Sequence, residues 1–278
     1  PYTEQYSLHY ETILNKNLEL AAKLITDSTD FIVLPESAIQ EDIWEEWIGR
    51  SISLRKIMKA LTQHPTTTFV TGATTYKLLK EGEEMTNAAR KFSKTTDHYY
   101  AFNTAILVEN DKDFQLHHKS KLTPGVEIMP SWWILKPIEK LAIDLGGTTG
   151  TLGREDHPVV FMKSTGTNIG VSPIICYESV YGEFVANSVK LGAGLIFVIT
   201  NDGWWGNTPG YRQHFLFSVL RAIETRRSMA RSANTGISAF INQRGDVFQQ
   251  TQYWEPAVIQ QEINANYELT YYTINGDY

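Results

Sequence analysis

The side chain best suited to nucleophilic chemistry in this sequence is its single thiol. Cys176 is the only cysteine and ends the apolar run Ile174-Ile175-Cys176. Free cysteines commonly act as small, inert, buried hydrophobes, and that interpretation stays open for Cys176. Open α/β sheets, however, build their sites at the carboxyl ends of strands. A thiol at such an end becomes a nucleophile when a neighbouring base removes its proton.

Two charged residues stand at comparable positions in the chain. Glu36 closes the apolar run at 31–34, and Lys119 follows a run that ends at Leu116. Taken singly, each is typical of a surface charge or, for Glu36, of a charge at a helix N-terminus. Together with Cys176 they supply an acid, a cation and a thiol, the residue types that acyl transfer needs. The set therefore predicts covalent acyl chemistry at strand ends.

The elements that must position these residues alternate between helix and strand. Apolar residues recur at helical spacing at 8–25, 180–191 and 211–231. Apolar or β-rich runs lie at 31–34, 67–75, 101–109, 169–176, 195–200, 236–242 and 247–251. The runs at 67–75 and 101–109 predict a hairpin-like pair. The alternation favours an α/β sheet covered by helices, and the lack of a Pro- or Gly-rich linker indicates a single domain.

Two tryptophan-bearing segments and a group of arginines stand apart from this pattern. The segments at 41–50 and 128–141 set large apolar side chains beside acids or prolines, so we expect loops or short helices outside the sheet. Within the predicted helix at 211–231, positions 221, 226, 227 and 231 are arginine. This run predicts a solvated or salt-bridged helix face. Arg221 and Glu224, spaced i, i+3, predict a structural ion pair.

Composition excludes several classes of function. The 278 residues include 25 basic and 31 acidic side chains, a net charge of −6 that argues against nucleic-acid binding. One cysteine excludes an internal disulfide framework, and the seven histidines show no ligand spacing, so we expect no metal. The longest apolar run, at 193–199, is far shorter than the roughly 20 residues that a spanning helix needs.

Short motifs around the three candidate residues carry a family resemblance. Leu34-Pro35-Glu36, Lys119 with Glu127, and Cys176-Tyr177-Glu178 resemble the Glu-Lys-Cys triad of the nitrilase, or carbon–nitrogen hydrolase, superfamily. The segments at 200–206, 213–214, 221–224 and 231–236 resemble the periplasmic catalytic domain of the apolipoprotein N-acyltransferase family. Two departures concern the surroundings of the lysine. His117 stands where the family often has an aromatic residue, and the loop at 124–127 reads Pro-Gly-Val-Glu without a Phe.

The resemblance implies a fold and a mechanism. The fold is a nitrilase-like α-β-β-α sandwich, here spanning residues 1–278 as one domain. Cys176 attacks the ester carbonyl of a phospholipid, Glu36 is the general base, and Lys119 stabilises the oxyanion. The thioester then passes its acyl chain to the amine of a diacylglyceryl-cysteine lipoprotein, with no metal or organic cofactor.

The resemblance also assigns supporting residues. Glu127 and Glu178 match further functional glutamates and are expected to orient Lys119 or keep it charged. Tyr177 and Asn201 are expected to line the pocket. The loop at 128–141 carries a lipid-facing pair of tryptophans, Trp132 and Trp133, which we expect to form a lid that enters the lipid interface. Packing of these side chains on the domain is the alternative.

The family setting is a bacterial inner membrane, with the catalytic domain on the periplasmic side against the membrane surface. We therefore expect the chain to be a soluble fragment that lacks its first strand and the flanking membrane helices. One alternative function is a soluble amidase or nitrilase that uses the same triad with water as second nucleophile. It is disfavoured because the residues at 179–183 read Ser-Val-Tyr-Gly-Glu, unlike soluble hydrolases of the superfamily. A non-catalytic binding module is disfavoured because all three triad positions are filled.

Overall fold

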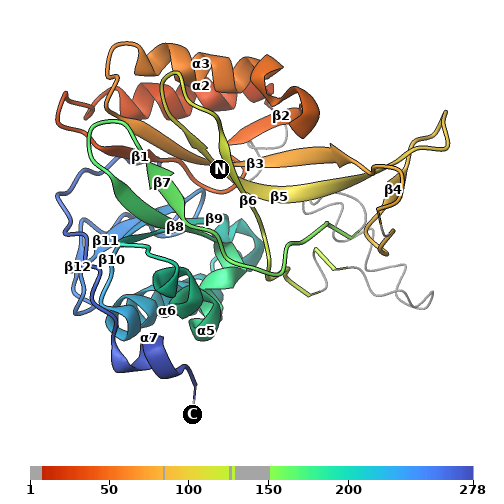
Figure 1. Cartoon of the computed structure of the whole chain (residues 1–278). Helices are drawn as coiled ribbons and strands as arrows, with labels where there is room; N and C mark the ends of the chain where they lie inside the picture. Colours follow the sequence, from red (N-terminus) through yellow and green to blue (C-terminus); the bar gives the residue numbers. More distant parts are fainter. Residues whose placement is uncertain (1–7, 84, 125–126, 129–150, 278) are drawn as a thin grey trace.

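Two six-stranded sheets pack face to face, with helices on their outer faces (Figure 1). The structure is a computed structural model that describes residues 8–83, 85–124, 127–128 and 151–277. These four layers confirm the predicted α/β class and the α-β-β-α sandwich. Among the residues so described, no helix is both long enough and apolar enough to cross a bilayer.

The first sheet centres on two long antiparallel strands. Its strands are β1 (Phe31–Val33), β2 (Ile39–Trp44), β3 (Thr68–Leu78), β4 (Arg90–Lys91), β5 (His98–Val108) and β6 (Gln115–His118). β3 and β5 pair along their whole length, which confirms the predicted pair at 67–75 and 101–109. β1 and β2 run parallel to successive parts of β3, and β4 and β6 pair with opposite ends of β5. The last residue of β6, His118, therefore lies opposite Thr104, near the middle of β5.

The second sheet has a parallel centre flanked by antiparallel strands. It contains β7 (Phe161–Lys163), β8 (Ile169–Ile175), β9 (Leu195–Thr200), β10 (Ser228–Ala233), β11 (Ala239–Ile241) and β12 (Val247–Phe248), in the order β12-β11-β10-β9-β8-β7. β8, β9 and β10 are parallel. Every residue of β9 is buried, which explains its unbroken apolar sequence, because parallel strands are covered on both faces.

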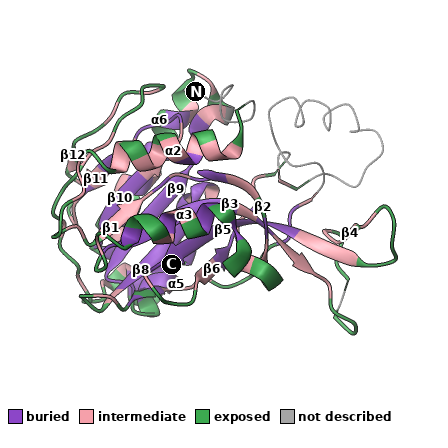
Figure 2. Cartoon of the chain, turned by 90° about the horizontal axis from the view of Figure 1, so that it is seen from above, coloured by how far each residue is buried: buried purple, intermediate pink, exposed green. Residues whose placement is uncertain are grey.

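Helices cover the outer face of each sheet. α2 (Tyr10–Ala21) and α3 (Ile52–Leu61) pack on the first sheet, and α5 (Gly182–Lys190) and α6 (Pro209–Thr225) on the second. The short α7 (Tyr271–Asn275) contacts α5 and α6. Between the sheets, Val70 and Leu107 meet Val171, Ile175 and Phe197 in one apolar cluster. Figure 2 shows this buried interior as purple strands beneath helices whose outer faces are exposed.

The predicted helix at 211–231 was wrong only in its last part, residues 226–231. α6 ends at Thr225, and Arg226 takes a left-handed conformation with φ 52° and ψ 41°. A left-handed residue commonly ends a helix, and the chain then enters β10. The arginines therefore do not share one solvated face, since Arg227 and Arg231 are buried. The Arg221–Glu224 ion pair is confirmed, with Nε 2.7 Å from Oε2.

The prediction for residues 41–50 was partly wrong. Residues up to Trp44 belong to β2 inside the first sheet, and only η1 (Glu45–Arg50) is a short 3-10 helix. α3 was not predicted at all. It begins where the Ser51 side chain accepts a hydrogen bond from the Leu54 amide, an N-cap that stabilises the first turn.

Candidate active site

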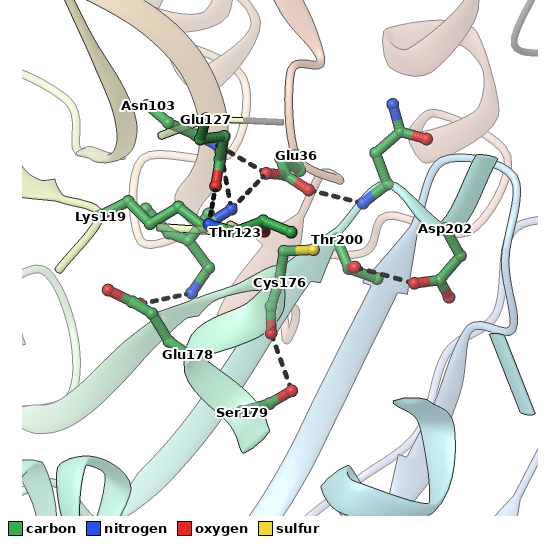
Figure 3. Close-up of polar contacts among 12 residues, drawn as sticks. Glu36, Asn103, Lys119, Thr123, Glu127, Cys176, Glu178, Ser179, Thr200 and Asp202 are labelled. Carbon is green, nitrogen blue, oxygen red and sulfur yellow. Dashed lines mark hydrogen bonds and ion pairs between the residues drawn. The ribbon is translucent and has the colours of Figure 1, made fainter. Parts of the chain in front are cut away.

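Three separate strand ends bring the predicted acid, cation and thiol together (Figure 3). Glu36 lies just beyond β1, while Lys119 and Cys176 directly follow β6 and β8. β1 and β6 belong to the first sheet and β8 to the second, so the site forms where the two sheets face each other. Only 4% of Glu36, 1% of Lys119 and 9% of Cys176 is exposed. Water is therefore largely excluded from the three side chains.

Both carboxylate oxygens of Glu36 have fixed partners. Oε1 accepts a hydrogen bond from Asn103 Nδ2 at 2.6 Å and lies 3.4 Å from Lys119 Nζ. Oε2 accepts a hydrogen bond from the backbone amide of Asn201 at 2.7 Å. Because Asn201 follows β9, this contact ties the acid of the first sheet to the second sheet.

The turn that presents Glu36 packs directly on the neighbouring strand. Ser37 has a positive φ of 54°, and the Gly72 amide on β3 donates to the Pro35 carbonyl at 3.2 Å. A Cβ at Gly72 would lie 2.7 Å from Glu36 Cα. A glycine is therefore required here for the backbone to approach.

Lys119 is held as a cation between two carboxylates. Its Nζ lies 2.9 Å from Glu127 Oε1 and 3.4 Å from Glu36 Oε1. Burial alone would lower the pKa of Lys119, but the charges of Glu127 and Glu36 outweigh it and raise the pKa well above its ordinary value. Burial likewise opposes the charge of Glu127, whose pKa the Lys119 cation holds below its usual range. Glu127 is thus placed to orient Lys119 and to favour its charged form.

Cys176 opens the 3-10 helix η3 (Cys176–Val180) in an unusual backbone conformation. Its φ of 49° is left-handed, which costs a residue other than glycine about 1–3 kcal/mol. The Sγ points toward Thr200, with the Glu36 carboxylate nearby (Figure 3). Burial and the negative charge of Glu36 raise the pKa of the thiol, against the opposing effect of Lys119. The resting group is therefore a protonated thiol, next to a carboxylate able to accept its proton.

Glu178 fixes the two strand ends rather than the Lys119 ammonium group. The side chain is fully buried, and its Oε1 accepts from the Ser120 amide at 2.6 Å while Oε2 accepts from the Ile175 amide at 2.8 Å. His117 Nε2 adds a contact at 3.1 Å. Ser120 follows the candidate lysine and Ile175 precedes the candidate thiol. The Glu178 carboxylate therefore positions the backbone next to both residues.

Two site residues were missed in the sequence. Asn103 Nδ2 bridges the Glu36 and Glu127 carboxylates, at 2.6 and 3.1 Å. Thr200 donates to Asp202 Oδ1 at 3.0 Å and lies beside the thiol. The usable signal was a polar residue inside or at the end of an apolar strand, because buried polar groups need partners.

The other residues predicted for the site differ in how they relate to Glu36, Lys119 and Cys176. Asn201 reaches Glu36 through its backbone, and its side chain accepts from the Gly203 amide at 3.1 Å. Tyr177 packs edge-on against Tyr181, with ring centroids 5.5 Å apart. Trp132 and Trp133 lie outside the described residues, as does most of the loop at 128–141. Within the described ranges, no group of three acidic, histidine or cysteine side chains is placed to hold a metal ion.

A comparison with protein families matches nearly the whole chain. The family model described as Carbon-nitrogen hydrolase matches residues 3–272. The chain belongs to the carbon–nitrogen hydrolase family. The match covers every strand and every candidate site residue of the described fold.

Curated relatives of this carbon–nitrogen hydrolase chain share one name. A protein named apolipoprotein N-acyltransferase from Pasteurella multocida is 28% identical over 267 residues, which cover 95% of this chain and 47% of that protein. Another of the same name from Chlorobaculum tepidum is 33% identical over 181 residues, or 64% of this chain and 34% of the relative. The chain thus spans about half the length of such relatives or less.

Solved structures agree on the fold. An amidase of the nitrilase superfamily from Nesterenkonia AN1 superposes with a TM-score of 0.54 and 15% sequence identity, covering 89% of this chain and 81% of the amidase. At this identity the likeness concerns the fold alone.

Proposed function

We propose that this protein is an N-acyltransferase that moves a fatty acyl chain from a phospholipid to the amino-terminal amine of a lipoprotein. The observation that carries the proposal is the buried cluster of Glu36, Lys119 and Cys176, in a chain that aligns over 95% of its length with a protein named apolipoprotein N-acyltransferase. Neither this cluster nor the fold by itself distinguishes acyl transfer from amide hydrolysis. The named relatives favour the transferase.

The first half of the reaction forms a thioester. Glu36 removes the thiol proton of Cys176 as its sulfur attacks the ester carbonyl of the phospholipid. The carbonyl oxygen becomes an oxyanion, which the Lys119 ammonium stabilises. The C–O bond then breaks, the leaving alkoxide takes the proton from Glu36, and a lysophospholipid departs.

The second half transfers the acyl chain to nitrogen. The free amine of a diacylglyceryl-cysteine attacks the thioester, and Lys119 again stabilises the oxyanion. The C–S bond breaks as the amide forms, and the amine proton passes through Glu36 to the sulfur of Cys176. This two-step scheme regenerates the protonated thiol that burial favours in the resting site.

The proposed substrates imply that the reaction takes place at a membrane surface. A phospholipid donor and a lipid-modified acceptor both reside in a membrane, so the catalytic domain works against a membrane surface. We place it on the periplasmic side of a bacterial inner membrane, where lipoproteins receive their amide-linked chain. The lipid-facing role of Trp132 and Trp133 belongs to the same proposal.

Intact-mass measurement tests the first half-reaction directly. The protein is incubated with phosphatidylethanolamine vesicles, and we expect a mass gain of one acyl group that hydroxylamine removes. Cys176→Ala, checked for an unchanged melting temperature, should gain nothing. A synthetic lipopeptide that begins with diacylglyceryl-cysteine should then discharge the acyl group, while the same peptide with an acetylated amine should not.

The same experiment separates the amidase alternative. An amidase would leave the protein unacylated by the vesicles and would hydrolyse a small aliphatic amide at the Cys176 thiol. Absence of a hydroxylamine-sensitive adduct, together with turnover of the amide, would refute the transferase proposal.

A further inference from the structure

A buried network lies against the backbone carbonyl of Cys176. It consists of Asp202, His214 and Arg231, which are 0%, 3% and 2% exposed. His214 Nε2 lies 3.0 Å from the Cys176 carbonyl oxygen. The proposed chemistry does not use any of these three side chains.

The donors and acceptors around Nε2 of His214 indicate that this nitrogen carries a proton. The Cys176 carbonyl oxygen can only accept hydrogen bonds. Ser179 Oγ already donates its single proton to this oxygen at 2.8 Å, so it has none left for His214 Nε2, which lies 3.0 Å away. A bare nitrogen at this place would face two oxygen lone pairs. Nε2 must therefore donate to the carbonyl.

The other ring nitrogen faces a carboxylate and a guanidinium. Nδ1 of His214 lies 2.8 Å from Asp202 Oδ1. Asp202 is a carboxylate, because the nearby Arg231 charge holds its pKa down at about 2 although burial opposes this. Arg231 donates to Asp202 Oδ2 at 2.9 Å and lies 3.2 Å from Nδ1. Nδ1 thus lies against both members of the Asp202–Arg231 ion pair, which hold the ring in place.

The consequence for Cys176 is mechanical. Its left-handed φ of 49° needs continuous support, and its carbonyl receives that support from His214 and Ser179.

We propose that His214, held by Asp202 and Arg231, is a positioning residue that fixes the Cys176 backbone and keeps its thiol beside Glu36 and Lys119. The role rests on the proposed function, in which Cys176 is the nucleophile. The proposal gives a role to Asp202, His214 and Arg231, none of which is one of the three proposed catalytic residues.

Two substitutions at His214 separate positioning from general stability. In His214→Gln, the longer amide can place an N–H donor near the position of Nε2 and keep the bond to the Cys176 carbonyl. In His214→Asn, the shorter amide reaches the position of Nδ1, so it keeps Asp202 but leaves the carbonyl without this donor. Arg227→Lys is the matched control, because Arg227 is equally buried and bonds to the Ala193 and Glu268 carbonyls instead.

Alkylation of Cys176 by iodoacetamide, followed by intact mass, is the first measurement. It reports thiol reactivity without any phospholipid, so it stays informative even if acyl transfer is not the activity. We expect His214→Asn to slow both alkylation and thioester formation at least tenfold with unchanged KM. We expect His214→Gln and Arg227→Lys to stay within about threefold of the wild type. Equal losses in the two His214 variants, or no loss in His214→Asn, would overturn the proposal.

A measurement on the unmodified protein covers the case in which His214→Asn fails to fold. Nitrogen-15 NMR distinguishes imidazolium from both neutral tautomers by the shifts of the two ring nitrogens, and the His214→Gln spectrum assigns the signal. We expect Nε2 of His214 to carry a proton. A ring with a bare Nε2 would refute the inferred network.

Discussion

His118, the residue immediately before the candidate lysine, should make the stability of the protein fall at alkaline pH. Its Nε2 lies 2.6 Å from Glu45 Oε1 and its Nδ1 2.8 Å from Glu155 Oε1. Burial opposes a charge on this ring, but the two carboxylates outweigh burial and raise the pKa of His118 to about 9. The perturbation that tests this arrangement is His118→Gln, which cannot carry the charge.

The expected magnitude follows from the two pKa values of His118. The ordinary value is 6.5, and the folded value is about 9. Each pH unit between them corresponds to 1.36 kcal/mol, so the charged ring stabilises the fold by about 3 kcal/mol. Because the folded pKa is the higher one, this contribution is fully present below pH 6.5 and is lost as pH rises through about 9.

Urea unfolding at pH 6, 7.5, 9 and 10 measures this contribution. The free energy of unfolding of the wild type should exceed that of His118→Gln by several kcal/mol at pH 6, and the difference should shrink by about 3 kcal/mol by pH 10. His64→Gln is the control. His64 pairs with Asp27 at 3.3 Å, but the Asp27 side chain is 99% exposed, and such surface pairs contribute about 0–1 kcal/mol.

A difference between wild type and His118→Gln that stays constant from pH 6 to 10 would refute the reasoning. The ring would then contribute only packing or neutral hydrogen bonds. The result also concerns the candidate active site, because Glu155 lies in the segment that contacts the Glu127 backbone. In that segment the Leu152 amide donates to the Glu127 carbonyl at 3.1 Å. Deprotonation of His118 should therefore loosen the support of Lys119.

The remaining predictions concern the buried carboxylates. Glu36→Gln should slow thioester formation on the order of 10²-fold or more, because the base for the thiol is lost; the rate of acyl-adduct formation by mass checks this. Glu178→Gln turns an amide NH₂ toward a backbone N–H and should cost about 1–3 kcal/mol in urea unfolding. Asp202, whose pKa is about 2 against an ordinary 3.8, contributes stability that is present above pH 3.8 and lost as pH falls through 2. That loss is about 2 kcal/mol in acid unfolding and should be absent in Asp202→Asn.

The sequence identified the strand ends better than the elements between them. Glu36, Lys119 and Cys176 could be found because each follows a buried apolar run, and the structure brings all three together. The fold class could be found because helical and strand periodicities alternate. The residues after apolar runs and the alternating periodicities can both be read from short stretches of sequence, without knowing which strands become neighbours.

What could not be predicted depends on long-range pairing. The end of α6 at Thr225 rests on the left-handed Arg226 and on β10 pairing with β9. Residues up to Trp44 became a strand because β3 offered them a parallel partner. Asn103 acquires its role only because β3 pairs with both β1 and β5, which brings Asn103 Nδ2 to 2.6 Å from Glu36. Each of these features depends on a contact with another strand, so the hydrophobic periodicity of a single segment could not reveal it.

The buried carboxylates explain how a site shared by two sheets can be pre-organised. Glu36 belongs to the first sheet and binds the Asn201 amide of the second, at 2.7 Å. Glu178 follows the second sheet and binds the Ser120 amide at the end of β6 in the first, at 2.6 Å. Each carboxylate thus accepts a hydrogen bond from the backbone of the opposite sheet, so the distance between the base and the thiol is set by rigid strands. Groups held in this way need little reorganisation when charge develops on the oxyanion, which is the condition for effective electrostatic catalysis.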